Sequence, residues 1–178
     1  MPLPLARTPQ ESLLYIELHA CECGEAAVRH DSHGTGQGDG YWTSHYELTC
    51  QGCGAGREFV FRTPDWPLNT GGYGGPEPSE IIDAGQWLII ADLVARSVPV
   101  TPSSVAEERA EQRRTLQVAV DAMAEILKFV PGQERVVPDS AFWTPEGRAQ
   151  RDREPGRFRR ERLQVVLDTY RSALEGLA

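Results

Sequence analysis

All four cysteines of the chain lie in two close pairs, and a glycine directly follows each pair. These residues are Cys21, Cys23 and Gly24, then Cys50, Cys53 and Gly54. A gap of one or two residues places two sulfurs on one side of a tight turn, and two facing turns form the tetrahedral thiolate site that Zn²⁺ prefers. Glycine suits such turns because it adopts positive φ without steric cost. The spacing therefore predicts one metal ion in a closed site that serves folding rather than catalysis.

The segments beside the cysteine pairs favour short strands. Residues 15–19 and 41–48 lead into the two pairs, and residues 58–62 alternate aromatic and β-branched side chains after the second. Residues 13–63 therefore resemble a zinc ribbon, a family in which two such turns sit on hairpin-like strands. The resemblance implies a structural Zn²⁺ ion held by Cys21, Cys23, Cys50 and Cys53. The first pair has one intervening residue, against the usual two.

Two disulfides or four free thiols are the alternatives to a metal. Residues 1–7 contain neither the apolar segment nor the cleavage signal of a leader peptide. In a reducing compartment paired cysteines more often hold metal than each other, so we expect a cytoplasmic metal-binding protein. His30 and His33 lie between the pairs and are alternative ligands if a cysteine is displaced. Solvent-facing histidines are the simpler interpretation.

Length and composition are typical of a soluble globular protein. The chain has 178 residues, 40% of them hydrophobic and 25% charged. No apolar run reaches the 18 or more residues typical of a membrane span. Of the cations, 17 are arginine and one is lysine, which is typical of a GC-rich bacterial genome. We expect an α+β protein, with a zinc-ribbon-like region at residues 1–70 packed on a helical body at residues 76–178, around one continuous or nearly continuous core.

Four helices are expected in the second half of the chain. Their start signals are Ser79, Ser104 with Glu107, Thr144 with Pro145, and Pro155. The first, residues 80–96, is apolar nearly all round and belongs at the centre of the fold. The second, residues 105–129, is charged in its first half and carries an apolar stripe in its second. Residues 30–40, with glycine at every second position from Gly34, favour a mobile hairpin connection over a phosphate-binding loop.

The net charge is concentrated in the half that contains the cysteines. Residues 1–100 carry 5 arginines and 13 acidic residues, a balance of −8, whereas residues 101–178 are balanced. Binding to phosphate depends on clustered cations, so this acidity argues against nucleic acid. A negative surface suits a basic protein partner, or it only keeps the protein soluble. Seven arginines from Arg148 to Arg162 form a cationic stretch, either a salt-bridged helix surface or a docking surface for an acidic partner.

No recurring catalytic motif occurs in the chain, and histidine is absent after residue 45, so we do not expect an enzyme. Our leading hypothesis is a non-catalytic intracellular zinc-binding protein that binds a protein partner through its acidic half. An adaptor, or an immunity protein that neutralises a basic toxin or effector, has this profile. One alternative is a nucleic-acid-associated zinc-ribbon protein that uses the Arg148–Arg162 stretch. A second is an enzyme with an unrecognised site.

Overall fold

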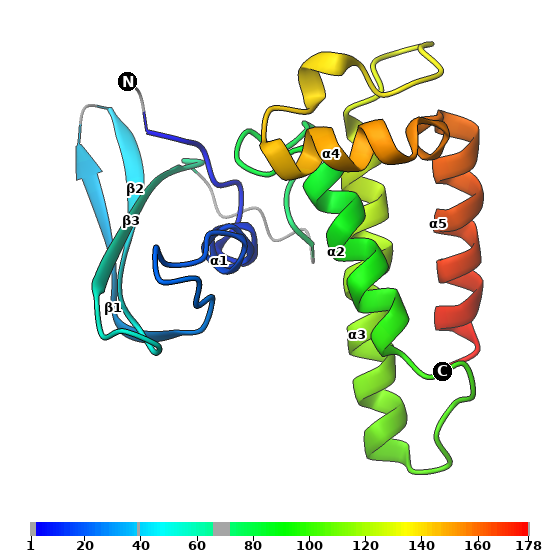
Figure 1. Cartoon of the computed structure of the whole chain (residues 1–178), viewed down its shortest axis with the longest axis horizontal. Helices are drawn as coiled ribbons and strands as arrows, with labels where there is room; N and C mark the ends of the chain where they lie inside the picture. The colour runs from blue at the N-terminus through cyan, green and yellow to red at the C-terminus, as the bar shows by residue number, and fades with distance from the viewer. Residues whose placement is uncertain (1–2, 39, 66–71, 178) are drawn as a thin grey trace. The chain divides into compact units, whose positions relative to one another are not determined.

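The structure, a computed structural model, describes residues 3–38, 40–65 and 72–177, and it forms two compact units, residues 1–81 and 82–178. The elements are α1 (Pro9–Leu18), β1 (Val28–Gly38), β2 (Tyr41–Cys50), β3 (Gly56–Thr63), α2 (Ala84–Ser97), α3 (Ala106–Lys128), η1 (Asp139–Ala141), α4 (Pro145–Arg153), η2 (Pro155–Phe158) and α5 (Arg160–Glu175) (Figure 1). The α+β class is confirmed. The expected boundary between residues 70 and 76 begins among residues outside the described ranges.

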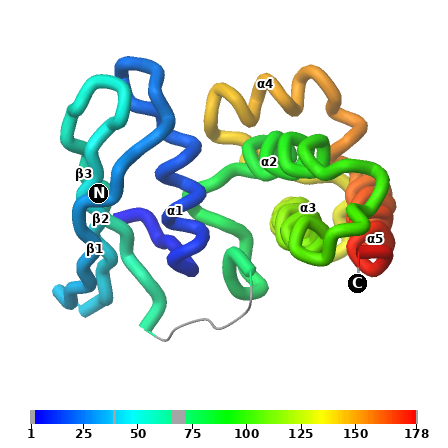
Figure 2. Tube along the Cα trace, turned by 90° about the horizontal axis from the view of Figure 1, so that it is seen from below, coloured from blue at the N-terminus to red at the C-terminus, as the bar shows by residue number. Residues whose placement is uncertain are grey.

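The N-terminal unit is an antiparallel sheet in the order β1-β2-β3 with one helix on its inner face (Figures 1 and 2). The strands predicted at residues 41–48 and 58–62 are confirmed as β2 and β3. The inner face buries Tyr46, Leu48 and Phe61. The ring of Tyr15 from α1 meets Phe61 edge-on, with ring centroids 5.4 Å apart. This face therefore supplies the apolar core of the unit.

The prediction of a strand at residues 15–19 is wrong, because α1 contains nearly all of that segment. Thr8 caps the helix, its hydroxyl accepting a hydrogen bond from the Glu11 N–H at 3.2 Å. Pro9 occupies the first turn, where its missing N–H costs nothing. This start signal was present in the sequence, but the short apolar run after it also fits a strand.

The prediction of a mobile connection over residues 30–40 is also wrong for the described part. Residues 28–38 form β1, which pairs with β2 along its length apart from a register shift between His30 and Ser32. An added Cβ on Gly36 would lie 3.1 Å from the Thr43 hydroxyl of β2. Glycine therefore permits close pairing here, and the backbone hydrogen bonds make a strand of a segment with almost no apolar side chains.

In the C-terminal unit α2 and α5 both lie beside α3 (Figures 1 and 2). Fully buried side chains include Trp87, Leu88, Met123, Ile126, Phe158 and Leu163. The apolar stripe predicted for the second half of α3 is confirmed, since the buried positions of this helix run from Leu116 to Ile126. Within the described ranges, no helix is both long and apolar enough to cross a membrane.

The helix starts required three corrections. α2 begins at Ala84, because Asp83, not Ser79, is the cap and forms a capping box with Gln86. The capping box of Ser104 and Glu107 is not formed, since Val105 occupies the cap position without a side-chain bond. Pro155 opens the 3₁₀ turn η2 rather than α5. The start at Thr144 with Pro145 is confirmed, and the Thr144 hydroxyl accepts the Gly147 N–H at 3.0 Å.

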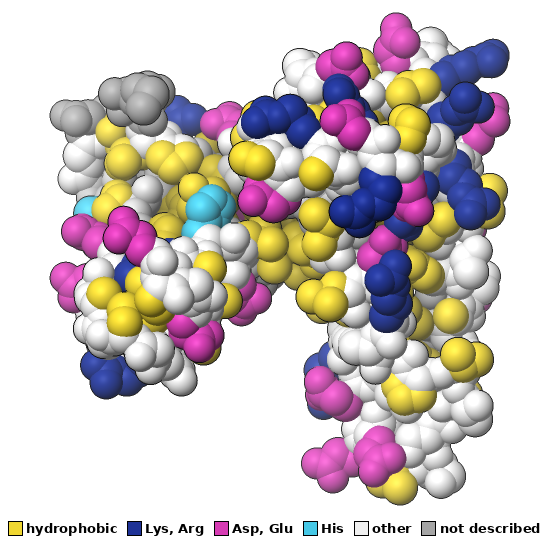
Figure 3. Space-filling view, viewed as in Figure 1, with side chains coloured by type: hydrophobic (Ala, Val, Ile, Leu, Met, Phe, Trp, Pro, Cys, Tyr) yellow, Lys and Arg dark blue, Asp and Glu magenta, His cyan; other side chains and the backbone are white. Residues whose placement is uncertain are grey.

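Several arginines of the Arg148–Arg162 stretch make contacts within the C-terminal unit. Arg157 binds both carboxylate oxygens of Asp92 on α2, at 2.5 and 2.7 Å. Arg151 pairs with Asp139 at 2.8 Å, and Arg160 donates to three backbone carbonyls. Basic and acidic side chains are interleaved on the surface of this unit (Figure 3). These arginines therefore stabilise the fold of the C-terminal unit itself. That the same stretch docks an acidic partner stays a prediction.

Candidate metal centre

The first cysteine turn connects α1 to β1. The Cys21 N–H donates to the Glu25 carbonyl at 2.8 Å, and the Gly24 N–H donates back to the Cys21 carbonyl at 2.7 Å. Gly24 has a φ of +90°, a conformation that side chains other than glycine rarely adopt. The turn therefore needs the glycine that follows the cysteine pair.

The second turn, between β2 and β3, repeats this pattern with one more residue. The Cys50 N–H donates to the Ala55 carbonyl at 2.9 Å, and the Gly54 N–H donates to the Cys50 carbonyl at 2.9 Å. Gly54 has a φ of +74°. Both turns thus close through the same two kinds of hydrogen bond, and the single-residue gap of Cys21 and Cys23 shortens the loop without changing its design.

Backbone contacts hold the two turns against each other. The Gln51 N–H at the start of the second turn donates to the Ala27 carbonyl at 3.0 Å. Gly52 packs directly on Glu25, where an added Cβ would lie 2.9 Å from the Glu25 Cβ. The β1–β2 pairing continues up to Val28 and Cys50. The relative position of the cysteine pairs is therefore set by the β1–β2 pairing, by the Gln51–Ala27 hydrogen bond and by the close packing of Gly52 on Glu25.

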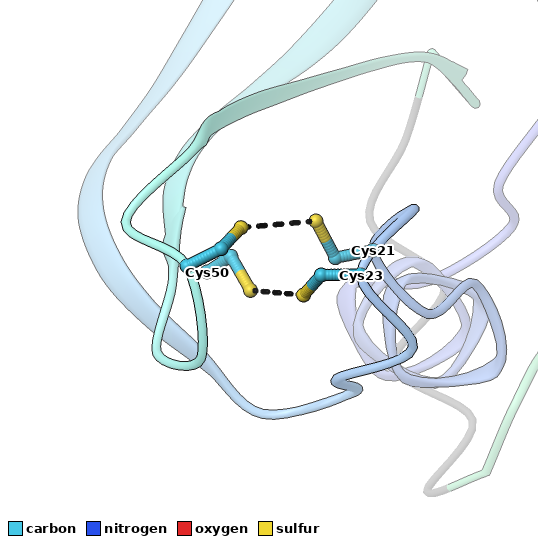
Figure 4. Close-up of side chains that lie close together, drawn as sticks. Cys21, Cys23 and Cys50 are labelled. Carbon is cyan, nitrogen blue, oxygen red and sulfur yellow. Dashed lines mark hydrogen bonds between the residues drawn. The ribbon is translucent and has the colours of Figure 1, made fainter.

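The four Sγ atoms converge between the turns, all within 4.8 Å of one another. Across the gap, Cys21 Sγ lies 3.7 Å from Cys53 Sγ, and Cys23 Sγ lies 3.6 Å from Cys50 Sγ (Figure 4). A disulfide requires about 2.05 Å between its sulfurs. A tetrahedron with Zn–S bonds of about 2.3 Å has S–S edges of about 3.8 Å. The sulfur spacing therefore fits one metal ion and not a pair of disulfides.

The predicted cysteines are thus brought together, and the predicted histidine alternatives are not among them. Within the described ranges, the group of side chains placed to hold a metal contains the four cysteines alone. His33 instead lies 2.8 Å from the Ser44 hydroxyl and stacks on Tyr46. The cluster and the adjoining three-stranded antiparallel sheet are compatible with a zinc-ribbon-like motif.

Sequence reasoning missed the residues that position the first turn from the side of α1. His19, the cap residue at the end of α1, stacks on Tyr15 with ring centroids 3.8 Å apart. The Arg57 guanidinium, from β3, donates to the His19 carbonyl and lies over the Phe59 ring, 4.9 Å from its centroid. No spacing rule links Arg57 to His19, because the contact joins segments 38 residues apart.

Backbone groups also favour the thiolate form of one ligand. Hydrogen bonds from the backbone of Cys53 and, to a smaller extent, Gly52 lower the pKa of the Cys50 thiol to about 7, although burial opposes this. Cys50 is buried, whereas Cys23 and Cys53 are exposed. A bound ion would therefore be shielded from solvent on the side of Cys50 and accessible to solvent on the side of Cys23 and Cys53.

Acid is expected to displace the metal. Only deprotonated thiols bind it. The backbone of Glu25 favours the thiolate of Cys23, but hydrogen bonds with the Cys53 and Cys50 side chains raise the pKa of the Cys23 thiol to about 12, so protons compete for this sulfur throughout the neutral range. They compete for Cys50 as well when the pH falls through about 7, the pKa of that thiol. Each proton taken up on release steepens the loss by about tenfold per pH unit. Transfer of zinc to a chromophoric chelator, followed from pH 8 to pH 5, measures this. An affinity that stays constant over that range would contradict thiolate ligation.

Comparisons of the chain with protein-family models, with curated proteins and with solved structures found no significant match.

Proposed function

We propose that the N-terminal unit is a structural zinc module whose acidic outer surface binds a basic protein partner. The observation that carries the zinc assignment is the convergence of four cysteine sulfurs within 4.8 Å. Four thiolates are a ligand set characteristic of structural Zn²⁺ and leave no open coordination position. Binding of the ion then adds folding free energy to a unit whose apolar core is small, and it fixes the two turns relative to each other.

The partner assignment rests on charge. Glu47 of β2 and Glu58 of β3 are directly opposite each other in the sheet, and both are exposed. Like charges in this arrangement destabilise a sheet. Neither carboxylate has an ion pair within the described part of the chain, where Glu47 accepts a hydrogen bond from the Ser32 hydroxyl at 2.7 Å. A cationic side chain placed between them relieves the repulsion.

Other exposed side chains of the N-terminal unit are also negatively charged. Exposed acidic residues of the N-terminal unit include Glu17, Glu22, Glu25, Glu47 and Glu58, named here the acidic surface. A zinc ion with four thiolates adds a charge of about −2 beside Glu22 and Glu25. Complementary potential of this kind accelerates encounter with a basic protein and selects against acidic ones. An adaptor, or an immunity protein for a basic toxin, would use such a surface.

The double variant Glu47→Gln/Glu58→Gln tests the proposal. Cross-linking of the tagged, zinc-loaded chain in its own cells, followed by mass spectrometry, is expected to recover one basic protein. We expect the variant to lose that protein or to bind it at least about tenfold more weakly, and added salt to weaken the wild-type complex.

The matched control is Glu161→Gln/Glu175→Gln, which removes the same charge from exposed positions of α5. It is expected to bind the partner as the wild type does. Recovery of nucleic acid without a protein, or equal loss of binding in both double variants, would overturn the proposal.

A further inference from the structure

The N-terminal unit contains a pocket of about 430 Å³ on the inner face of its sheet. It exists because the helix is shorter than the strands. α1 and β2 each have 10 residues, which span about 15 Å as a helix and about 33 Å as a strand. The pocket is lined at one side by the first turn of α1 and at the other by the start of β2. Its size lies in the range typical of small-molecule sites.

The pocket is separate from the cysteine cluster. Trp42, which lines it, is near the start of β2, and Cys50 ends the same strand. Eight residues of strand place these positions about 26 Å apart. A ligand in the pocket and a metal at the cysteines therefore occupy opposite ends of one sheet.

The walls of the pocket are largely apolar, with one aromatic surface. Ala6, Pro9 and Pro64 contribute to the lining, together with the indole of Trp42, which is 41% exposed. Serine and threonine hydroxyl groups also line the pocket, and the Ser44 hydroxyl already makes a hydrogen bond with His33 at 2.8 Å. An exposed indole in a concave site offers a face on which a cation or a planar group can rest.

The charges around the pocket favour a cation over an anion. Arg7 lines the pocket, but its guanidinium is engaged by the Glu11 carboxylate at 2.5 to 3.1 Å, with both side chains at most 4% exposed. Its positive charge is therefore compensated. The carboxylate of Asp65, also in the lining and exposed, has no ion pair among the residues that the structure describes. The uncompensated charge at the pocket is negative.

We propose that this pocket binds a small organic cation, a protonated amine carried on an apolar body. The ammonium group binds to the Trp42 ring and the Asp65 carboxylate, and the apolar body packs against Pro9 and Pro64. An indole and a carboxylate that line the same pocket form a combination that recognises such cations. This inference is independent of the acidic surface, because none of its five residues lines the pocket.

Three probes of equal size and different charge test the proposal: benzylamine, benzyl alcohol and benzoate. With the zinc-loaded full chain at pH 8, benzylamine is expected to shift the indole ¹H–¹⁵N resonance of Trp42 saturably. Benzoate is expected to leave it unchanged, and benzyl alcohol to bind at least about fivefold more weakly than benzylamine. Equal binding of all three, or no movement of the Trp42 resonance, would overturn the proposal.

Two variants locate the cation. Asp65→Asn keeps the size of the side chain, and Trp42→Leu keeps an apolar one; each is expected to weaken benzylamine binding at least about fivefold. Trp143→Leu removes an indole of similar exposure, 39%, from the C-terminal unit and is expected to change nothing. The variant Glu47→Gln/Glu58→Gln is also expected to bind benzylamine normally. Full affinity in Asp65→Asn would refute the assignment.

Discussion

Removal of the metal is expected to unfold the sheet of the N-terminal unit. The apolar core of this unit lies on one face of a three-stranded sheet under a helix of 10 residues. Structural zinc contributes about 10–16 kcal/mol in small zinc-finger peptides, more than such a core supplies by itself. Treatment with a strong chelator, or the variant Cys50→Ala, should therefore replace the dispersed native NMR resonances of β1 to β3 with those of an unfolded chain. Metal analysis of the untreated protein should give one zinc per chain.

The histidine variants are the matched controls for this experiment. His30 and His33 lie on β1 between the cysteine pairs, but they do not belong to the sulfur cluster. His30→Ala and His33→Ala should each retain one zinc per chain and a folded sheet. A protein that keeps its sheet after complete removal of the metal would contradict the structural role. Loss of zinc in a histidine variant would contradict the ligand assignment.

The variant Asp83→Ala is expected to destabilise the C-terminal unit by about 3–4 kcal/mol. Asp83 is fully buried and caps α2, where one carboxylate oxygen accepts the Gln86 N–H at 2.8 Å. The other oxygen accepts the Trp143 and Thr144 N–H groups and the Thr144 hydroxyl, at 3.1, 2.8 and 2.6 Å. Its removal leaves those partly buried donors without their acceptor. Urea unfolding followed by the helical circular dichroism signal measures the loss.

The packing around Asp83 supplies a second, sterically different variant. An added Cβ on Gly147 of α4 would lie 2.1 Å from an Asp83 carboxylate oxygen, and one on Gly85 would lie 2.4 Å from the Gly147 backbone. Gly147→Ala is therefore expected to separate α4 from α2, with a loss of similar size. Asp152→Ala, at an exposed position of α4, should stay within about 0.5 kcal/mol of the wild type. Equal stability of all three variants would show that this contact does not hold the helices.

The errors at residues 15–19 and 28–38 arose because apolar periodicity is a weak signal in both segments. Residues 15–19, in which apolar and polar side chains are mixed, fit a strand as well as a helix. The helix forms because Thr8 and Pro9 provide a start signal before this segment. Residues 28–38 have almost no apolar side chains, so periodicity identified no strand there. In the structure their backbone groups pair with β2, a partner that is visible only once the two segments are aligned.

The cysteine cluster could be predicted from the sequence because the information that specifies it is local. The gaps between the cysteines and the glycine after each pair determine two turns that aim their sulfurs to one side, and Gly24 and Gly54 do adopt positive φ. The α+β class and α3 follow equally from local patterns, since the apolar residues of a helical stripe recur within a few positions of each other.

Contacts between distant segments were decided only in the tertiary structure. Asp83 accepts hydrogen bonds from residues 60 and 61 positions later, and Arg7 meets Glu77 across 70 positions. The pocket likewise depends on a helix that covers only part of a sheet. Such contacts are selected by the packing of whole elements, for which residue spacing carries no signal. The sequence alone thus determined which ligands could hold a metal, and the packing of elements decided what lies beside them.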